Sequence, residues 1–117
     1  MKIAYKVWLD HHGKVFGDGP YELLKWVDKT KSLHQAAHQM GMAYSKAWKL
    51  ILTLEERLGF FLLERRVGGK CGGGSWVTPQ GKELMKRYRL FQKEVKTSLE
   101  RIYQTYFSSM KKRRLLK

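Results

Sequence analysis

Residues 32–58 have the sequence SLHQAAHQMGMAYSKAWKLILTLEERL, which predicts two helices joined by a tight turn. The first helix begins with a capping box at residues 32–35, in which a serine accepts a backbone hydrogen bond one turn on and a glutamine reaches back. Gly41 ends this helix, because glycine tolerates the left-handed conformation of a C-cap. In residues 43–58 apolar side chains recur every three or four positions, which predicts a second helix that ends at Gly59.

A two-stranded hairpin is predicted after the two helices. Residues 60–66 have the composition of a strand, residues 68–74 are rich in glycine, and an extended segment resumes at Trp76. Glycine at a hairpin tip lets the backbone approach another molecule closely. Two short helices followed by such a hairpin are typical of a winged helix-turn-helix, with the wing at about residues 62–78.

The longest predicted element is a helix over residues 79–110. Thr78 and Pro79 supply a cap and a proline at the first helical position. Apolar residues recur at helical spacing along it, and we interpret this stripe as a dimerisation seam or core surface. One face of the helix is expected to pack on the winged domain and the other to meet a second copy of the chain. The stripe consists of Leu84, Tyr88, Phe91, Val95, Leu99, Ile102 and Tyr106.

The N-terminal part is predicted to add a β-hairpin and a helix. Apolar side chains alternate in residues 3–9, as in a half-buried strand, and residues 14–16 can return beside it. A helix is expected from Pro20 to about Thr30. The predicted fold class is therefore mainly α with a small β component. Its parts are a winged helix-turn-helix domain (1–78), a long dimerisation helix (79–110) and a basic tail (111–117).

The charge of the chain indicates a polyanionic partner. Its 117 residues include 24 Lys and Arg against 10 Asp and Glu, for a formal net charge of +14. Residues 61–117 hold 15 of the basic and 4 of the acidic side chains. Such an excess repels itself in the folded state and is typical of proteins that bind nucleic acid. Charge and fold together predict binding to double-stranded DNA.

The predicted DNA contacts come from the two helices and the wing. A recognition helix needs an exposed face that can donate hydrogen bonds to bases and phosphates in the major groove. The helix at 43–58 presents Ser45 and Lys49 opposite its apolar residues, in its first two turns. Two interpretations of Trp48 stay open, packing or a contact with a base or sugar. The expected DNA contacts are Ser32, Gln35, Tyr44, Ser45, Lys46, Trp48, Lys49, Arg65, Arg66 and Lys70.

These motifs give the chain a family resemblance that extends from residue 32 to about residue 81. The strings GMAYSKAW at 41–48, LLERR at 62–66 and GGKCGGG at 68–74 resemble the winged helix-turn-helix of ModE-type molybdate-responsive regulators, which is related to the LysR-type DNA-binding domain. The resemblance implies a dimeric DNA-binding transcriptional regulator, with the recognition helix in the major groove and the wing on the flanking backbone. Full-length members carry C-terminal oxyanion-binding domains, and this chain ends where they would begin. Neither molybdate binding nor a small-molecule effector domain is therefore expected of it.

Two other functions are considered beside sequence-specific regulation by a homodimer. A non-specific architectural or nucleoid protein would bind through charge alone, and competition with random DNA distinguishes it from a specific regulator. A protein–protein adaptor would use the long helix and would give no DNA shift at low salt.

Several other classes of function are not expected. Cys71 is a single cysteine and is interpreted as a small wing residue rather than a redox sensor. His34 and His38 have a spacing that suits a metal ion, but they are interpreted as part of a solvated face. No paired carboxylates, nucleophile–base set or cofactor fingerprint indicates an enzyme, so catalytic residues, metals and cofactors are not predicted. No apolar run is long enough to cross a membrane, and a cytoplasmic, nucleoid-associated protein is expected.

Overall fold

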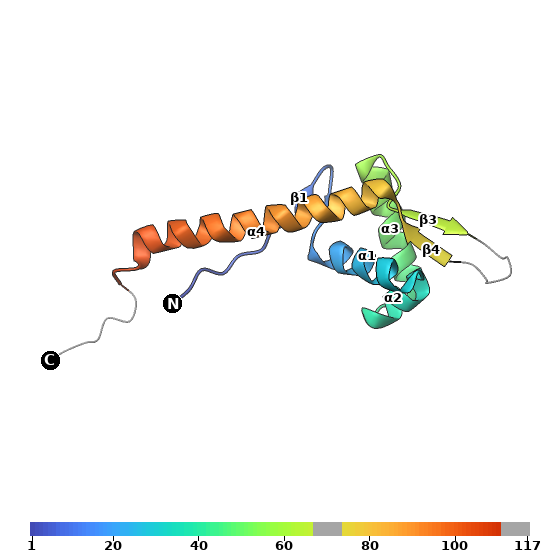
Figure 1. The fold of residues 1–117 in the computed structure, drawn as a ribbon, viewed down its shortest axis with the longest axis horizontal. Coiled ribbons are helices and arrows are strands. Elements are labelled where there is room, and N and C mark those ends of the chain that lie inside the picture. The colour runs from blue at the N-terminus through green and yellow to red at the C-terminus, as the bar shows by residue number, and fades with distance from the viewer. Residues whose placement is uncertain (67–73, 111–117) are drawn as a thin grey trace.

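The molecule is a small helical domain from which one long helix extends (Figure 1). The computed structural model describes residues 1–66 and 74–110, and residues 67–73 and 111–117 are outside the description. The principal-axis extents are 75 × 27 × 21 Å. The elements in chain order are β1 (Leu9–Asp10), β2 (Lys14–Phe16), α1 (Asp18–Thr30), α2 (Leu33–Gln39), α3 (Tyr44–Leu58), β3 (Leu63–Arg66), β4 (Gly74–Val77) and α4 (Pro79–Phe107). This architecture confirms the predicted winged helix-turn-helix fold.

The helix boundaries follow the capping residues in the sequence. The Ser32 hydroxyl accepts a hydrogen bond of 3.0 Å from the backbone N–H of Gln35, so the serine half of the capping box is present. Gly41 adopts a φ of 67° in the turn after α2, and Gly59 adopts a φ of 83° as the C-cap of α3. The turn between α2 and α3 is therefore set where the sequence predicts it.

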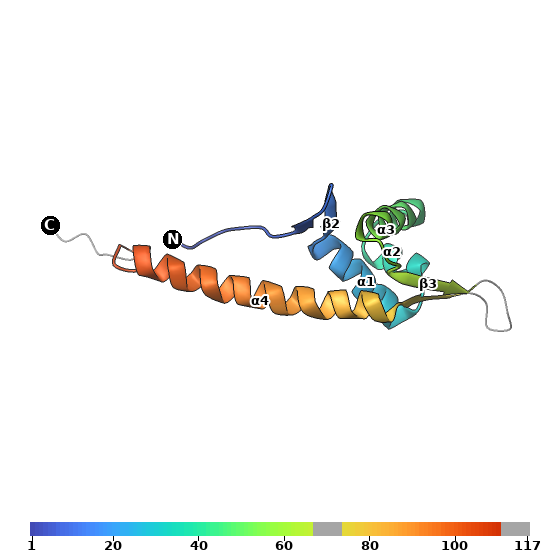
Figure 2. The same ribbon diagram turned by 90° about the horizontal axis from the view of Figure 1, so that it is seen from above.

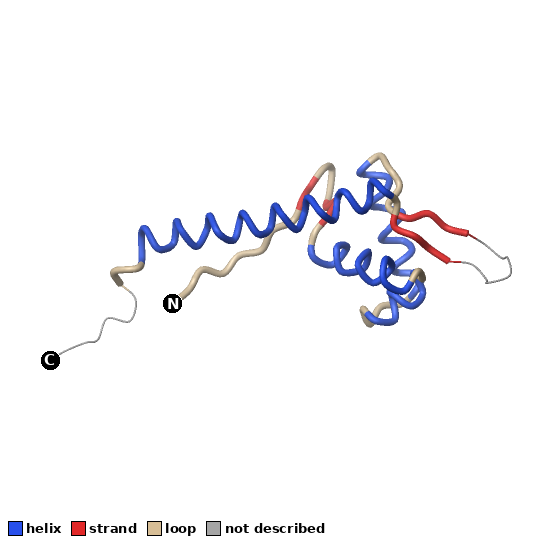
Figure 3. Tube along the Cα trace, in the orientation of Figure 1, coloured by secondary structure: helices blue, strands red, loops and turns tan. Residues whose placement is uncertain are grey.

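Helices α1, α2 and α3 pack around one apolar core (Figure 3). The apolar stripe of each helix faces this core, and β2, the wing and the first turns of α4 close it. The two short strand pairs lie at the periphery, β1 with β2 near the start of α1 and β3 with β4 at the wing. The largest fully buried side chains are Phe16, Leu23, Leu24, Val27, Leu33, Ile51, Leu54, Leu62 and Tyr88.

The wing strands β3 and β4 pair antiparallel, with Leu63 opposite Val77 and Arg66 opposite Gly74. The strand predicted from residue 60 begins only at Leu63. Its start is delayed because the buried carboxylate of Glu55 accepts the backbone N–H groups of Leu62 and Leu63, at 2.8 and 3.1 Å. These bonds attach the start of the wing to α3.

The prediction of a strand over residues 3–9 is wrong, since β1 contains only Leu9 and Asp10. Residues 1–8 instead run along α4, as both views show (Figure 2). The Tyr103 hydroxyl donates to the Met1 carbonyl at 2.8 Å, and the Tyr88 hydroxyl donates to the Val7 carbonyl at 3.1 Å. Because β2 has only three residues, a longer strand at residues 3–9 would have no partner along most of its length. Of its predicted apolar face, Leu9 packs against the core and Tyr5 is 45% exposed.

The long helix α4 begins as the sequence predicts and ends slightly earlier. The Thr78 hydroxyl accepts a hydrogen bond of 2.9 Å from the Gly81 N–H, and proline occupies the first turn. The helix ends at Phe107 rather than about Met110, and the Met110 N–H closes a turn onto the Phe107 carbonyl. The predicted basic tail lies outside the described residues.

The two faces of α4 divide the predicted apolar stripe. Tyr88 is 1% exposed, and its ring meets Phe16 edge to face at 5.2 Å. Leu84 packs against the same core and is half-buried. This burial corrects the assignment of Tyr88 to a seam between copies, because its ring lies inside its own domain. The rest of the stripe is exposed or half-buried and consists of Phe91, Val95, Leu99, Ile102 and Tyr106.

Candidate nucleic-acid interface

The predicted DNA-binding side chains gather where α2 and α3 begin, beside the wing. A shallow concavity lies between these three elements. Its lining includes Ser32 and His34 from α2 and its cap, Tyr44 from α3, and Arg65 and Arg66 from β3. Residues far apart in the sequence therefore share one surface because the wing folds back beside the helix pair.

The first two turns of α3 present a polar face to solvent. Ser45, Lys46 and Lys49 are exposed. On the opposite side Ala47 and Ile51 are completely buried, which fixes the rotation of the helix. The helix therefore has a free donor-bearing face at its N-terminal end, as a major-groove reader requires.

A row of stacked rings joins α2 to α3. The His34 and Tyr44 rings stack at a centroid distance of 5.3 Å, and the Tyr44 and Trp48 rings at 6.4 Å. Tyr44 is 44% exposed, whereas Trp48 is half-buried. The guanidinium carbon of Arg65 lies 3.1 Å from the Trp48 ring centroid. With Arg65 covering its indole, Trp48 is placed to pack between the recognition helix and the wing, which favours the packing interpretation of this residue.

Arg65 is held in a partly desolvated position. Its Nε and Nη2 atoms are buried and have no hydrogen-bond partner among the described residues. Burial lowers the pKa of Arg65 from its ordinary value, while the nearby Glu55 carboxylate and Tyr44 act in the opposite direction. Arginine keeps its charge through such shifts. Arg65 is also among the residues that line the concavity, so its charge favours an anion there.

The other residues predicted to contact DNA include Arg66, Gln35 and Ser32. The guanidinium of exposed Arg66 lies 4.9 Å from the Trp76 ring centroid. Gln35 is exposed on α2, and Ser32 is half-buried because its oxygen caps that helix. The serine hydroxyl still has a proton to donate. Lys70 lies outside the described residues, as does Cys71.

Three residues outside the predicted list of DNA contacts help to form this part of the molecule. Ser75 lines the concavity, and its N–H donates to the Lys31 carbonyl at 3.0 Å, which attaches β4 to the end of α1. His34, interpreted from the sequence as part of a solvated face, is exposed and its ring stacks on Tyr44. Glu55 has no partner predictable from sequence, because its hydrogen bonds are to backbone atoms in the next segment. Its position on the otherwise apolar face of α3 is the one feature of the sequence that could have indicated a buried role.

The other expectations concern metals and membranes. Within residues 1–66 and 74–110, no group of three or more His, Cys, Asp or Glu side chains is arranged to hold a metal ion. In the described part of the chain, no helix combines the length and apolar character needed to cross a membrane.

Residues 21–82, more than half of the chain, match the family of bacterial regulatory helix-turn-helix proteins of the LysR type. The chain belongs to this family, and the match covers α2, α3 and the wing. The class of protein defined by fold and surface is thus a bacterial helix-turn-helix regulator.

Within that class, the chain is similar to ModE proteins, which confirms the resemblance found in the sequence. It is 36% identical over 78 residues to the DNA-binding transcriptional dual regulator ModE of Escherichia coli K12, covering 66% of this chain and 30% of the relative. It is 29% identical over 90 residues to the molybdenum transport protein ModE of Azotobacter vinelandii, and this match covers 77% of the chain and 33% of the relative. The molybdenum-pterin-binding protein MopB of Rhodobacter capsulatus is 31% identical to the chain over 87 residues, and this match covers 74% of the chain and 32% of the relative. The chain therefore spans about a third of the length of these relatives.

Proposed function

We propose that the protein is a sequence-specific regulator of transcription that binds double-stranded DNA as a homodimer. The observation that carries the proposal is the free polar face of α3, with Ser45, Lys46 and Lys49 exposed beside the Arg65–Arg66 strand. This face enters the major groove, and the wing binds the flanking backbone. Family membership and the charge of +14 support the same function.

Sequence preference rests on the first two turns of α3. Ser45 and Lys49 can donate hydrogen bonds to base edges, whereas Arg66 and Lys70 of the wing bind phosphates, which carry no sequence information directly. Arg65 lies between these groups and lines the concavity at the base of the wing, and we assign its charge to the DNA backbone.

Dimerisation is assigned to the distal half of α4. Ile102 is 46% exposed and Tyr106 is 71% exposed, and both lie on the apolar stripe beyond the winged domain. Two copies that meet along this stripe carry two recognition helices. In dimeric helix-turn-helix proteins the half-sites lie about 34–36 Å apart, or at multiples of that distance.

The experiment that tests the function is selection of bound fragments from a pool of random duplexes with the intact protein. We expect an enriched motif with two-fold symmetry, and a preference of about 10³-fold or more over random DNA at physiological salt. Lys49→Ala is expected to weaken binding to the selected motif by about 1–3 kcal/mol and to alter the motif. Binding without any enriched motif would instead favour the non-specific architectural function.

A further inference from the structure

One face of α4 carries a row of cations that the function proposed above does not use. The residues are spaced by four, three, four and three positions, so they lie on one face of the helix. The last lies 14 positions after the first, which corresponds to about 21 Å at 1.5 Å per residue. All five are exposed. We call this set the basic face of α4, and it consists of Lys82, Lys86, Arg89, Lys93 and Lys96.

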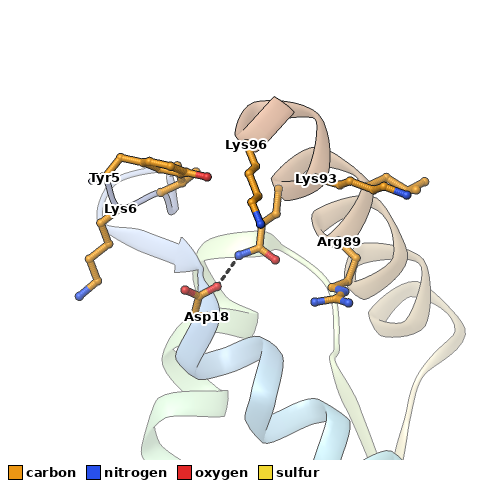
Figure 4. A pocket seen from close by; sticks show the side chains of 9 residues that line it. Tyr5, Lys6, Asp18, Arg89, Lys93 and Lys96 are labelled. Carbon is orange, nitrogen blue, oxygen red and sulfur yellow. Dashed lines mark hydrogen bonds between the residues drawn. The ribbon is translucent and has the colours of Figure 1, made fainter. Parts of the chain in front are cut away.

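The basic face borders a hollow between α4, the start of α1 and the N-terminal segment (Figure 4). Four cationic residues line it, three from α4 and Lys6 from the N-terminal segment. Lys96 and Arg89 reach toward the space near Asp18, while Lys6 and Lys93 lie on the rim and point outward.

Two carboxylates near the basic face, Asp18 and Asp28, already form hydrogen bonds or ion pairs. Asp18 accepts hydrogen bonds from Tyr88 and Gln92. Asp28 lies 3.6 Å from Lys82 and also contacts Lys31. In the part of the chain that the structure describes, the other four cations of the basic face form no ion pair. Asp18 is the one carboxylate among the described residues that line the hollow, beside four cationic residues.

The basic face begins at the base of the wing. Lys82 lies four residues after Thr78, which follows directly on β4. Its partner Asp28 is also bonded to Lys31, whose carbonyl accepts the Ser75 N–H of β4. The row of cations is thus continuous with the surface where the DNA backbone is expected.

We propose that the basic face of α4 binds the phosphate backbone of duplex DNA, in addition to the contacts made by α3 and the wing. An extended polyanion suits this surface better than a small anion does. Exposed ion pairs contribute little individually, whereas a row of cations on DNA gains from the release of condensed counterions. The proposal rests on DNA binding by the winged domain, and the phosphates belong either to the flank of the same duplex or to a second duplex.

The test measures the salt dependence of binding by the intact protein to mixed-sequence duplexes of about 20 and about 40 base pairs. The double variant Lys93→Gln/Lys96→Gln removes two cations of the basic face. Its matched control, Arg87→Gln/Arg101→Gln, removes two cations from other sides of the same helix, where Arg87 is already paired with Glu83 at 2.8 Å. All four side chains are exposed, so both variants are expected to keep the melting temperature of the parent protein.

We expect the slope of log K against log salt to become shallower by about 1.8 in the basic-face variant, and by much less in the control. A change confined to the longer duplex assigns the phosphates to the flank of the bound DNA. If a second duplex supplies them, the parent protein links two differently labelled duplexes and the basic-face variant does not. The proposal is overturned if the parent protein and the basic-face variant give equal slopes on both duplexes and the parent protein does not link two duplexes. An equal effect of the control overturns it as well. Failure of the parent protein to bind any duplex at low salt would refute the proposed function itself.

Discussion

At the scale of single residues, the contact between Trp48 and Arg65 connects the recognition helix to the wing. The indole belongs to α3, the guanidinium to β3, and the two lie 3.1 Å apart from carbon to ring centroid. A cation on a partly desolvated aromatic face contributes up to about 2 kcal/mol. Replacing the ring therefore affects the position of the wing more than the reading of bases.

Trp48→Ala is expected to weaken binding to all duplexes alike, because the wing loses its support while Ser45 and Lys49 stay in place. The free energy of unfolding should fall by about 2 kcal/mol. Trp48→Phe keeps an aromatic face for Arg65 and should recover much of both losses. The measurements are urea unfolding and competition between the selected motif and random DNA. A loss restricted to the selected motif would show that the indole contacts a base.

Tyr88 introduces a pH dependence of stability. Its pKa is raised by burial of the phenol and further by the nearby Asp18 carboxylate, to which the hydroxyl donates at 3.3 Å. The unfolded chain releases this proton near the ordinary tyrosine value of about 10, while the folded chain still holds it. The contribution of the protonated Tyr88 hydroxyl to the free energy of unfolding is therefore fully present below about pH 10, and it is lost as the pH rises toward the folded-state pKa.

Urea unfolding at about pH 8 and at about pH 10.5 tests this effect. Tyr88→Phe is expected to be less stable than the parent protein at the lower pH, because the hydroxyl bonds to Val7 and Asp18 are lost. Its stability should fall less between the two pH values. Tyr5→Phe is the control, since that ring is 45% exposed and lies off the apolar stripe of α4, and it should retain the full decrease. The same decrease in all three proteins would contradict the assignment to Tyr88.

At the scale of elements, the position of α4 depends on a close approach at Gly81. A Cβ atom at this residue would lie 2.9 Å from both the Leu62 carbonyl oxygen and a methyl carbon of Val77. Since alanine normally favours a helix by about 0.5–1 kcal/mol over glycine, a helix propensity argument predicts that Gly81→Ala stabilises the protein. The packing predicts the reverse.

Gly81→Ala is expected to lower the free energy of unfolding by about 1–3 kcal/mol, because the added methyl group forces α4 away from the base of the wing. The measurement is thermal or urea unfolding. Ser98→Ala, in the middle of the same helix, is the matched control and should change stability by less than about 0.5 kcal/mol. Equal stability of Gly81→Ala and the parent protein would show that the backbone relaxes at no cost.

The elements differ in how far their sequence predicts them. Ser32, Gly59 and Thr78 are local cap residues, so the start of α2, the end of α3 and the start of α4 follow from neighbours in the chain. The segment at residues 1–8 has the alternation of a strand, but its packing partner is Tyr88 and the helix around it, some 80 residues away. The same holds for Arg65 and Trp48, because no local pattern specifies which cation covers which ring. The composition of the candidate interface is therefore predictable, and its internal contacts are not.

At the scale of the whole molecule, the shape separates DNA reading from assembly. Figure 1 shows the winged domain at one end and the distal half of α4 at the other. From the sequence, deletion of residues 84–110 is expected to leave a monomer that binds half-sites poorly. In the structure it also removes Tyr88 and the Leu84 contact from the core, so such a truncation would unfold the winged domain as well.

Point variants on the distal part of α4 avoid this problem. Ile102→Glu/Tyr106→Glu places two carboxylates on the exposed apolar stripe, and we expect it to convert a dimer into a folded monomer in analytical ultracentrifugation. Thr97→Glu/Thr105→Glu adds the same charge on exposed positions off the stripe and should stay dimeric. The monomer should bind one half-site as the parent protein does, but lose about 10²–10⁴-fold on a duplex with two half-sites, because the second contact is no longer intramolecular. A parent protein that sediments as a monomer, or two double variants with equal assembly, would contradict dimerisation through this stripe.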